Sequence, residues 1–174
     1  MSVRFRRVDY LKKGGYMSKS DRELFRAAVF VIIRDEAGRV LLQRRANTGY
    51  LDGHYDFPSG HVDAGEGFTT AATRETLEET GLAVDEEDLK LKHANINHSG
   101  VPYINIVFET EVWAGEPRIM EPEKCDDMGF YDVSALPEKC SLAVRYVERA
   151  GFDTSCTTSY VNHDEFKNLL HIVD

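Results

Sequence analysis

The chain has 174 residues, of which 42% are hydrophobic and 29% charged, a balance typical of a globular protein with one sizeable core. Its net charge of −9 disfavours a nucleic-acid polymer as the partner, because phosphate binding requires a basic surface. The three cysteines (Cys125, Cys140 and Cys156) form no disulfide or zinc pattern, and no apolar run approaches transmembrane length. We therefore expect a cytoplasmic protein without a membrane partner.

The N-terminal third of the chain predicts an extension followed by strands. Residues 1–22 are basic, contain Gly14-Gly15 and lack the apolar stretch of a signal peptide, so we expect a mobile extension outside the domain. Branched and aromatic residues then predict two strands that form a hairpin around the turn at Asp35–Gly38. Shorter extended pieces flank the turn at Pro58–Gly60. The predicted strands and extended pieces span 25–34, 40–45, 55–57 and 61–62.

A helix is predicted from about Thr69 to Thr80, with Gly81 ending it in the C′ position. Its only apolar residues are Ala71, Ala72 and Leu77, which makes it a poor packing helix by composition. Its residues are therefore expected to serve something other than the core.

The acidic residues of this helix crowd together. Because successive residues advance by about 100°, Glu75, Glu78 and Glu79 fall within one arc of the helix surface. Their mutual repulsion is tolerable if they are solvated or if a cation lies among them, and Mg²⁺ prefers such oxygen ligands. The alternative, an ordinary solvated face, is disfavoured because the opposite face of the helix is not strongly apolar.

The remainder of the chain continues the mixture of strands and helices. An amphipathic helix is predicted at 139–150, and a weak helix near 164–172 lies in a C-terminal tail that spans 151–174. Strands before, around and after a central helix, followed by a second helix, predict an α/β sandwich with a mixed sheet. Further strands are predicted at 88–97, 103–113 and 128–133.

One stretch, Gly60 to Leu82, resembles the Nudix box, G-x5-E-x7-R-E-U-x-E-E-x-G-U, where U is a bulky aliphatic residue. Thr76 departs from the pattern at the first U position. The resemblance implies a Nudix-type α/β/α sandwich over residues 23–150, in which the box forms a loop, a helix and a loop. The matching positions are Gly60, Glu66, Arg74, Glu75, Glu78, Glu79, Gly81 and Leu82.

Nudix proteins typically use Mg²⁺, with Mn²⁺ as a substitute, to hydrolyse nucleoside diphosphates linked to a further group. The resemblance implies that Glu75 or Glu78 orients or deprotonates the attacking water. Glu66 either binds metal or holds the loop, and Arg74, the box arginine, is expected to form a fork-type pair with a loop carboxylate, which would position the helix. The implied metal ligands are Glu66, Glu75, Glu78, Glu79 and the backbone carbonyl of Ser59.

Outside the box, three residues are candidates for substrate binding. Arg45 follows Arg44 at the end of a strand, and alternation places the two on opposite faces; Arg45 matches an arginine that binds a substrate phosphate in related hydrolases. Phe57 either flanks the base or belongs to the core. Glu121 begins an E-P-E-K-C element that resembles Nudix enzymes acting on nucleoside triphosphates, where a carboxylate lies near the metals; the alternative is a solvated acidic loop.

The resemblance favours a small-molecule nucleotide substrate, most of all a (d)NTP cleaved to (d)NMP and pyrophosphate. One alternative is an ADP-ribose or nucleotide-sugar pyrophosphatase; the proline that often marks ADP-ribose hydrolases beyond the box is matched only by the misplaced Pro102. The tyrosine that often marks dinucleoside polyphosphate hydrolases is matched only by Tyr103, which comes late. Another alternative is a non-catalytic Nudix-fold nucleotide-binding module with a regulatory role, which is disfavoured because every box carboxylate is present. The oligomeric state stays open.

Overall fold

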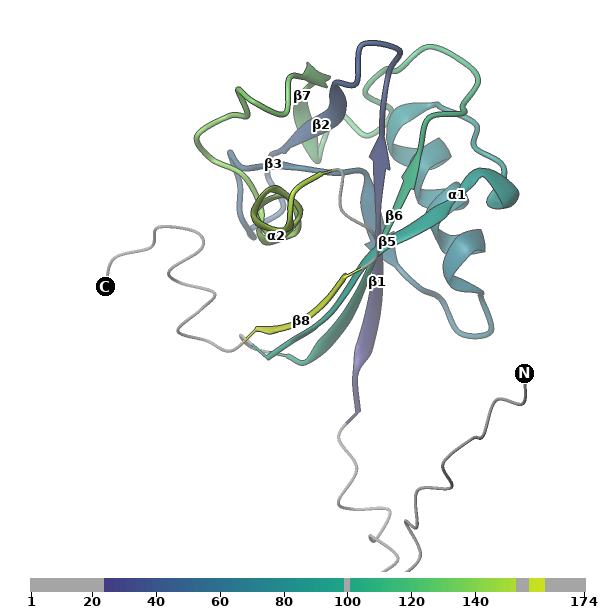
Figure 1. The fold of residues 1–174 in the computed structure, drawn as a ribbon, viewed down its shortest axis with the longest axis vertical. Helices are drawn as coiled ribbons and strands as arrows, with labels where there is room; N and C mark the ends of the chain where they lie inside the picture. Colours follow the sequence, from purple (N-terminus) through teal and green to yellow (C-terminus); the bar gives the residue numbers. More distant parts are fainter. Residues whose placement is uncertain (1–23, 99–100, 153–156, 162–174) are drawn as a thin grey trace, which may run out of the picture.

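The computed structural model describes residues 24–98, 101–152 and 157–161 (Figure 1). Its elements, in chain order, are β1 (Arg26–Ile33), β2 (Val40–Arg45), β3 (Tyr55–Asp56), β4 (Ser59–His61), α1 (Phe68–Thr80), the 3₁₀ turn η2 (Glu86–Asp88), β5 (Lys90–Asn97), β6 (Tyr103–Thr110), β7 (Cys125–Tyr131), α2 (Leu142–Ala150) and β8 (Thr157–Val161).

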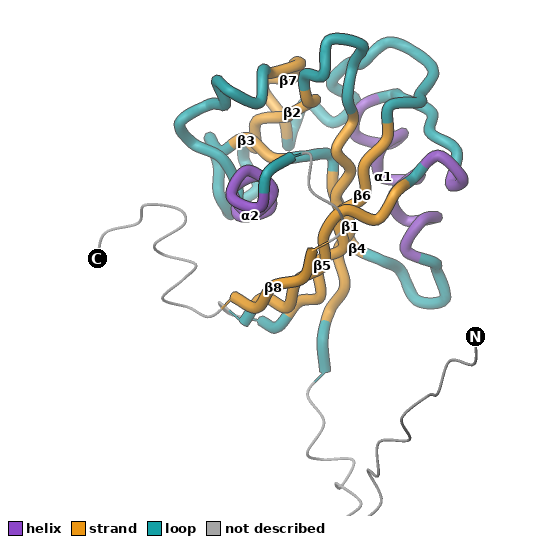
Figure 2. The backbone as a smooth tube through the Cα atoms, in the orientation of Figure 1, coloured by secondary structure: helices purple, strands orange, loops and turns teal. Residues whose placement is uncertain are grey.

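The strands form two sheets. The larger sheet has the order β4-β1-β6-β5-β8 and is mixed, because β1 runs parallel to β6 and β5 runs parallel to β8, whereas the other neighbours are antiparallel. The smaller sheet, β3-β2-β7, is antiparallel. Helix α1 covers one side of the larger sheet, and α2 lies on the other side with the smaller sheet (Figure 2). The predicted α/β/α sandwich with a mixed sheet is confirmed.

The predicted hairpin between the first two strands is wrong beyond its turn. Gly38 N donates to Asp35 O, as expected for a tight turn, but a single bridge between Arg34 and Val40 is all that joins β1 to β2. β1 instead pairs with β4 and β6, and β2 pairs with β3 and β7. The physical reason is that β1 is buried on both faces, so it takes a central place in the larger sheet.

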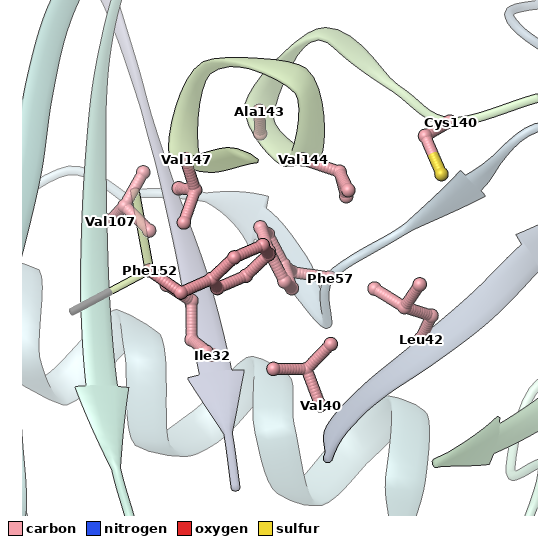
Figure 3. Close-up of a cluster of buried hydrophobic side chains, with 10 residues drawn as sticks. All are labelled: Ile32, Val40, Leu42, Phe57, Val107, Cys140, Ala143, Val144, Val147 and Phe152. Atoms are coloured by element: carbon pink, nitrogen blue, oxygen red, sulfur yellow. The ribbon is translucent and has the colours of Figure 1, made fainter. Parts of the chain in front are cut away.

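Alternate residues of β1 build two cores on opposite faces of the sheet. Val29, Val31 and Ile33 pack with the small apolar residues of α1. Ile32 faces the other way and packs with Phe57 beneath α2 (Figure 3). This second core also contains Val40, Leu42, Val107, Cys140, Ala143, Val144, Val147 and Phe152.

Both helix ends follow from local chemistry. Gly81 ends α1 with a φ of 73°, the left-handed conformation that glycine adopts readily, as predicted. Helix α2 begins three residues later than predicted, because Ser141 caps it: the Ser141 side chain accepts a hydrogen bond from Val144 N, while Lys139 O accepts from Tyr55 N. Within the described residues, neither helix combines the length and apolar character needed to cross a membrane.

The chain after α2 contains a strand that the sequence did not indicate. Residues 157–161 form β8, which pairs in parallel with β5 at the edge of the larger sheet. The region expected to be a tail therefore contributes to the fold. The extension predicted at 1–22 and the weak helix predicted near 164–172 lie outside the described residues.

Candidate active site

A cavity of about 770 Å³ lies between the two sheets, a volume suited to a nucleotide-sized ligand. Residues from both sheets, from α1 and from the first turn of α2 line it. Of the residues predicted to form the site, the cavity is lined by Arg45, Ser59, Glu75, Glu78, Glu79 and Glu121, whereas Phe57, Glu66 and Arg74 do not line it.

Glu79 projects its carboxylate from α1 toward the small sheet and the turn before β4. Its Oε2 accepts hydrogen bonds from Ser59 N at 2.8 Å and from Gln43 Nε2 at 2.6 Å. Burial raises the pKa of Glu79 to about 8, against these two hydrogen bonds, and the nearby Glu75 and Asp56 carboxylates add to the rise. No ion pair joins Glu79 to a basic side chain in the described part of the chain. Its charge is therefore held in place by dipoles but is not neutralised.

Glu75 lies one turn earlier on the same helix and packs against the glycine that opens the box. A Cβ added at Gly60 would lie 1.9 Å from the Glu75 Cδ, so the carboxyl group occupies the space that any other residue would fill. Burial raises the pKa of Glu75, and a 2.8 Å hydrogen bond from Arg74 Nη1 opposes that rise. The glycine therefore sets how close Glu75 can approach β4.

Arg74 ties the helix to the loop before it. Its Nε and Nη2 each donate to the Glu66 carboxylate at 2.9 Å, its Nη1 donates to Glu78 at 3.2 Å, and its Nη2 also donates to His61 O at 3.0 Å. This fork, together with Asp63 N, lowers the pKa of Glu66 to about 2. The fork predicted from the sequence is present. Neither Arg74 nor Glu66 lines the cavity, which favours a positioning role for both, while a catalytic role for Arg74 and metal binding by Glu66 stay predictions.

Glu121 approaches the box helix from a loop far along the chain, as the sequence suggested. It lines the cavity, and its negative charge is one of the causes of the raised Glu75 pKa. Lys124 Nζ donates to Glu121 Oε1 at 2.8 Å, while Lys124 N and Cys125 N donate to the Glu121 carbonyl. The backbone of the E-P-E-K-C element thus forms a turn that directs an acid and a lysine into the cavity.

Arg45 shapes a loop of the cavity wall. A register shift between Arg44 and Arg45 interrupts the strand alternation, and both side chains line the cavity, which corrects the expectation of opposite faces. Arg45 Nε donates to Tyr50 O at 2.9 Å and Nη2 donates to Thr48 Oγ1 at 3.3 Å, with the guanidinium 5.7 Å from the centre of the Tyr50 ring. Arg44 is paired with Asp126 at 2.7 Å.

Phe57 is a core residue. Its side chain is fully buried beneath α2, and Figure 3 shows it between β1, β2 and α2. It has no surface with which to stack on a base, so the prediction of a base-flanking role is wrong. An aromatic residue next to a glycine turn cannot be assigned to core or cavity without knowing where the smaller sheet packs.

Gln43 and Asp56 are among the cavity residues that the sequence reasoning missed. They lie directly opposite each other in the β2–β3 register, and both are buried. Each is a polar residue inside an apolar stretch, V-L-L-Q and Y-D-F-P, and that interruption was the signal available in the sequence.

The donor set of the cavity fits a hard divalent cation that shares its coordination with a substrate. Within residues 24–98, 101–152 and 157–161, no three acidic, histidine or cysteine side chains lie close enough to enclose an ion unaided. Mg²⁺, however, is usually bound by one or two carboxylates together with water and substrate phosphates. The Glu79 carboxylate lacks a cationic partner, and the buried Gln43 Oε1 lacks a donor in the described chain, so both are short of positive charge.

Comparison with known proteins agrees with this geometry. The model of the NUDIX domain matches residues 24–149. A Bacillus subtilis (strain 168) protein named "Putative 8-oxo-dGTP diphosphatase" is 40% identical over 58 residues, which are 33% of this chain and 36% of that protein. An RNA pyrophosphohydrolase from Dinoroseobacter shibae is 37% identical over 65 residues, 37% of this chain and 39% of that protein. These matches span little more than a third of each relative's length.

Among solved structures, the MutT NUDIX hydrolase from Burkholderia pseudomallei is similar, with a TM-score of 0.67 and 27% sequence identity. The match covers 73% of this chain and 98% of that chain. The likeness thus extends over most of this chain and nearly the whole of that chain.

Proposed function

This chain belongs to the Nudix family, and from that premise we propose that it hydrolyses a phosphoanhydride bond of a small nucleotide with the help of Mg²⁺. The favoured reaction converts a nucleoside triphosphate to the monophosphate and pyrophosphate. Mn²⁺ is the expected substitute for Mg²⁺.

The observation that carries this proposal is the convergence of four carboxylates, from Glu75, Glu78, Glu79 and Glu121, on one cavity of nucleotide size. Two of them, Glu75 and Glu79, have raised pKa values because burial disfavours their charged forms. Burying these carboxyl groups does not stabilise the fold, whereas carboxylates placed in this way can bind a cation that also binds a phosphorylated substrate.

The proposed roles follow from the contacts of each residue. When bound, Mg²⁺ neutralises phosphate oxygens and makes a bound water more acidic. Glu75, Glu78 and Glu79 provide carboxylate ligands, with the Ser59 carbonyl as a backbone ligand, while the hydrogen bonds from Ser59 N and Gln43 fix the Glu79 carboxylate. Arg74 holds α1 in place through Glu66.

In the proposed reaction, water attacks phosphorus and pyrophosphate leaves. Glu75 or Glu78 accepts a proton from the attacking water, whose oxygen forms a new bond to phosphorus. The P–O bond of the anhydride breaks, and its electron pair leaves with the pyrophosphate. Arg45, which forms no ion pair within the described residues, lines the same cavity together with Arg44 and Lys124, and these residues supply positive charge for the phosphate groups.

A triphosphate is favoured over an ADP-ribose or nucleotide-sugar substrate on two grounds. The E-P-E-K-C turn brings Glu121 and Lys124 into the cavity beside α1. The names of the relatives from B. subtilis and D. shibae also describe cleavage of nucleotide or RNA phosphates. A non-catalytic binding module would not need the full set of box carboxylates that the chain retains.

A substrate panel tests the proposal. Nucleoside triphosphates, ADP-ribose, nucleotide sugars and a 5′-triphosphorylated RNA are offered with Mg²⁺ or Mn²⁺, and the released phosphate or pyrophosphate and the nucleotide product are identified. The expected result is monophosphate and pyrophosphate from triphosphates, lost in Glu79→Gln but kept in the exposed control Glu87→Gln. A preference for ADP-ribose would overturn the triphosphate assignment, and absence of any cleavage would overturn the hydrolase.

A further inference from the structure

Asp56, on β3, lies in the cavity wall without a part in the proposed hydrolysis. Its side chain is almost fully buried, with 6% exposed. One carboxylate oxygen, Oδ1, accepts hydrogen bonds from Phe57 N at 2.9 Å and from Ser141 Oγ at 2.5 Å. The other oxygen, Oδ2, has no hydrogen-bond partner in the described chain. Asp56 lines the cavity and Oδ2 is not among the fully buried unpaired atoms of the described chain, so Oδ2 is open to the cavity and can accept a hydrogen bond from a ligand or from water.

The charge around Asp56 indicates what kind of donor this is. No lysine or arginine of the described chain forms an ion pair with Asp56. The charge of Arg45 reaches Asp56 and opposes the rise of its pKa, but the two form no ion pair, and the unpaired carboxylate disfavours phosphate groups beside it, so this part of the cavity suits the uncharged end of a nucleotide. Burial raises the pKa of Asp56 to about 6, which leaves an ionised group, able only to accept hydrogen bonds, at neutral pH.

Apolar residues line the cavity near Asp56. Ser141 leads directly into Leu142 and Ala143, which line the cavity at the start of α2, and Phe30 lines it from β1. Apolar residues together with a carboxylate acceptor match a nucleobase, which has apolar faces and a polar edge.

The distance from the glutamates is also suitable. Asp56 is directly opposite Gln43 in the strand register, and Gln43 donates to Glu79. Opposite residues of an antiparallel pair are about 5 Å apart, and the Gln43 side chain spans the remaining gap to the hydrolytic carboxylates. A base at Asp56 therefore leaves its phosphates within reach of Glu79.

We propose that Asp56 is a specificity-determining residue that accepts hydrogen bonds from the nucleobase, which makes guanine nucleotides the preferred substrates. Guanine presents two adjacent donors, N1–H and the 2-amino group, on one edge. Adenine presents an acceptor, N1, at the corresponding place, which a carboxylate repels. This inference rests on the proposed function, because it assumes that the cavity holds a nucleotide.

The test compares dGTP with dITP, which lacks only the 2-amino group. Wild-type enzyme is expected to prefer dGTP by about tenfold or more in kcat/KM, the effect of one hydrogen bond to a charged group. Asp56→Asn keeps an acceptor for Ser141 and turns an amide donor toward the base, so the preference should fall to about unity. The matched control, Asp85→Asn on the surface, should keep the preference.

A second variant separates base recognition from a purely structural role. Ser141→Ala removes a hydrogen bond to Oδ1 but leaves Oδ2 in the cavity, so it should lower the thermal stability and keep the preference for dGTP. If Asp56→Asn lowers kcat/KM equally for all bases, Asp56 only braces α2 and the inference is overturned. A change in the ratio of GTP to dGTP instead would assign the donor to the sugar, which also overturns it.

Binding without hydrolysis distinguishes this inference from the proposed function. Calorimetry with GMP, IMP and AMP measures base preference even if no nucleotide is cleaved. Tighter binding of GMP than of IMP in the wild type, lost in Asp56→Asn, supports Asp56 whether or not cleavage occurs. Cleavage of triphosphates with no preference dependent on Asp56 would sustain the function and overturn this inference.

Discussion

The two sides of helix α1 carry the same residue type in opposite electrostatic environments. On the loop side, Glu66 receives a two-pronged hydrogen bond from Arg74, and its pKa falls to about 2. On the cavity side, Glu79 is held by an amide and a backbone N–H, and its pKa rises to about 8. The difference indicates that the carboxylate on the loop side has a positively charged partner within the chain. Glu79, on the cavity side, has no such partner in the described residues, so a bound cation would have to provide the positive charge.

This contrast divides the box into residues that position helix α1 and residues that take part in the proposed reaction. The Arg74 network joins α1 to the loop that precedes it and requires no ligand. The cavity side holds carboxyl groups whose ionisation is unfavourable in the metal-free protein and would be favoured by a bound cation. Each of the following changes is directed mainly at one side, although Arg74 also donates to Glu75 and Glu78 on the cavity side.

The largest effect is expected from Glu79→Gln. The amide keeps the size of the side chain but cannot carry the negative charge that binds a cation. We therefore expect kcat/KM to fall roughly a hundredfold to several thousandfold, which corresponds to a loss of about 3–5 kcal/mol of transition-state stabilisation. Steady-state kinetics on the preferred triphosphate measures the loss. Glu87→Gln, an exposed substitution of the same kind, should leave the rate unchanged. Near-normal turnover of Glu79→Gln would remove Glu79 from the metal ligands.

A smaller effect is expected from Arg74→Lys on the loop side. Lysine keeps the charge but cannot donate the two parallel hydrogen bonds to Glu66, so α1 shifts and kcat/KM should fall about tenfold to a hundredfold. Kinetics and thermal unfolding are measured together, because a positioning residue should lose activity and stability in parallel. Arg149→Lys, exposed at the end of α2, is the control. An inactive but fully stable Arg74→Lys would instead point to contact with the substrate.

Gly60→Ala should displace Glu75 alone. The new methyl group would overlap the Glu75 carboxyl group, which can swing away because it ends a flexible side chain, so we expect about a tenfold loss of kcat/KM with little loss of stability. Gly129→Ala adds the same methyl group on β7, where its nearest neighbour, a Tyr131 ring atom, would lie at an ordinary 3.7 Å, and it should be close to neutral. Full activity of Gly60→Ala would contradict the requirement for Glu75 at this position.

The stability of the metal-free protein should depend on pH in opposite directions on the two sides. A carboxyl group whose folded pKa is raised binds its proton more tightly in the folded state, so between the ordinary value of 4.5 and about 8 the Glu79 contribution makes stability fall as pH rises, by up to about 1.4 kcal/mol per pH unit. Glu79→Gln should flatten this slope between pH 6 and 8 in chemical unfolding. The Glu66 contribution is present above pH 4.5 and is lost as pH falls toward about 2. An unchanged slope in Glu79→Gln would contradict the burial of an uncompensated charge.

The sequence was most informative where the spacing itself determines geometry. Residues three and four apart share a helix face, so the relative positions of Glu75, Glu78 and Glu79 could be predicted, and a glycine after a helix predicted the left-handed Gly81. The Arg74 fork was implied by the Nudix resemblance. The Nudix resemblance extended these local patterns to the sandwich as a whole.

The sequence was least informative where two distant strands meet. The donor to Glu79, Gln43, lies 36 residues away, and its partnership depends on how the smaller sheet packs against α1. Phe57 and Asp56 are neighbours in the chain, yet one enters the core and the other faces the cavity, which the local pattern does not decide. Strand β8 pairs only through its contact with β5, so its short segment carries no strong signal of its own.

The most direct test of the uncompensated charge is thermal unfolding at pH 8 with and without Mg²⁺, in the wild type and in Glu79→Gln. A cation that binds only the folded state stabilises it, so about 10 mM Mg²⁺ should raise the wild-type Tm by about 3 °C or more, and it should raise the Tm of Glu79→Gln clearly less. Equal shifts in the two proteins, or no shift in the wild type, would contradict the assignment of the cavity side of α1 as a cation site.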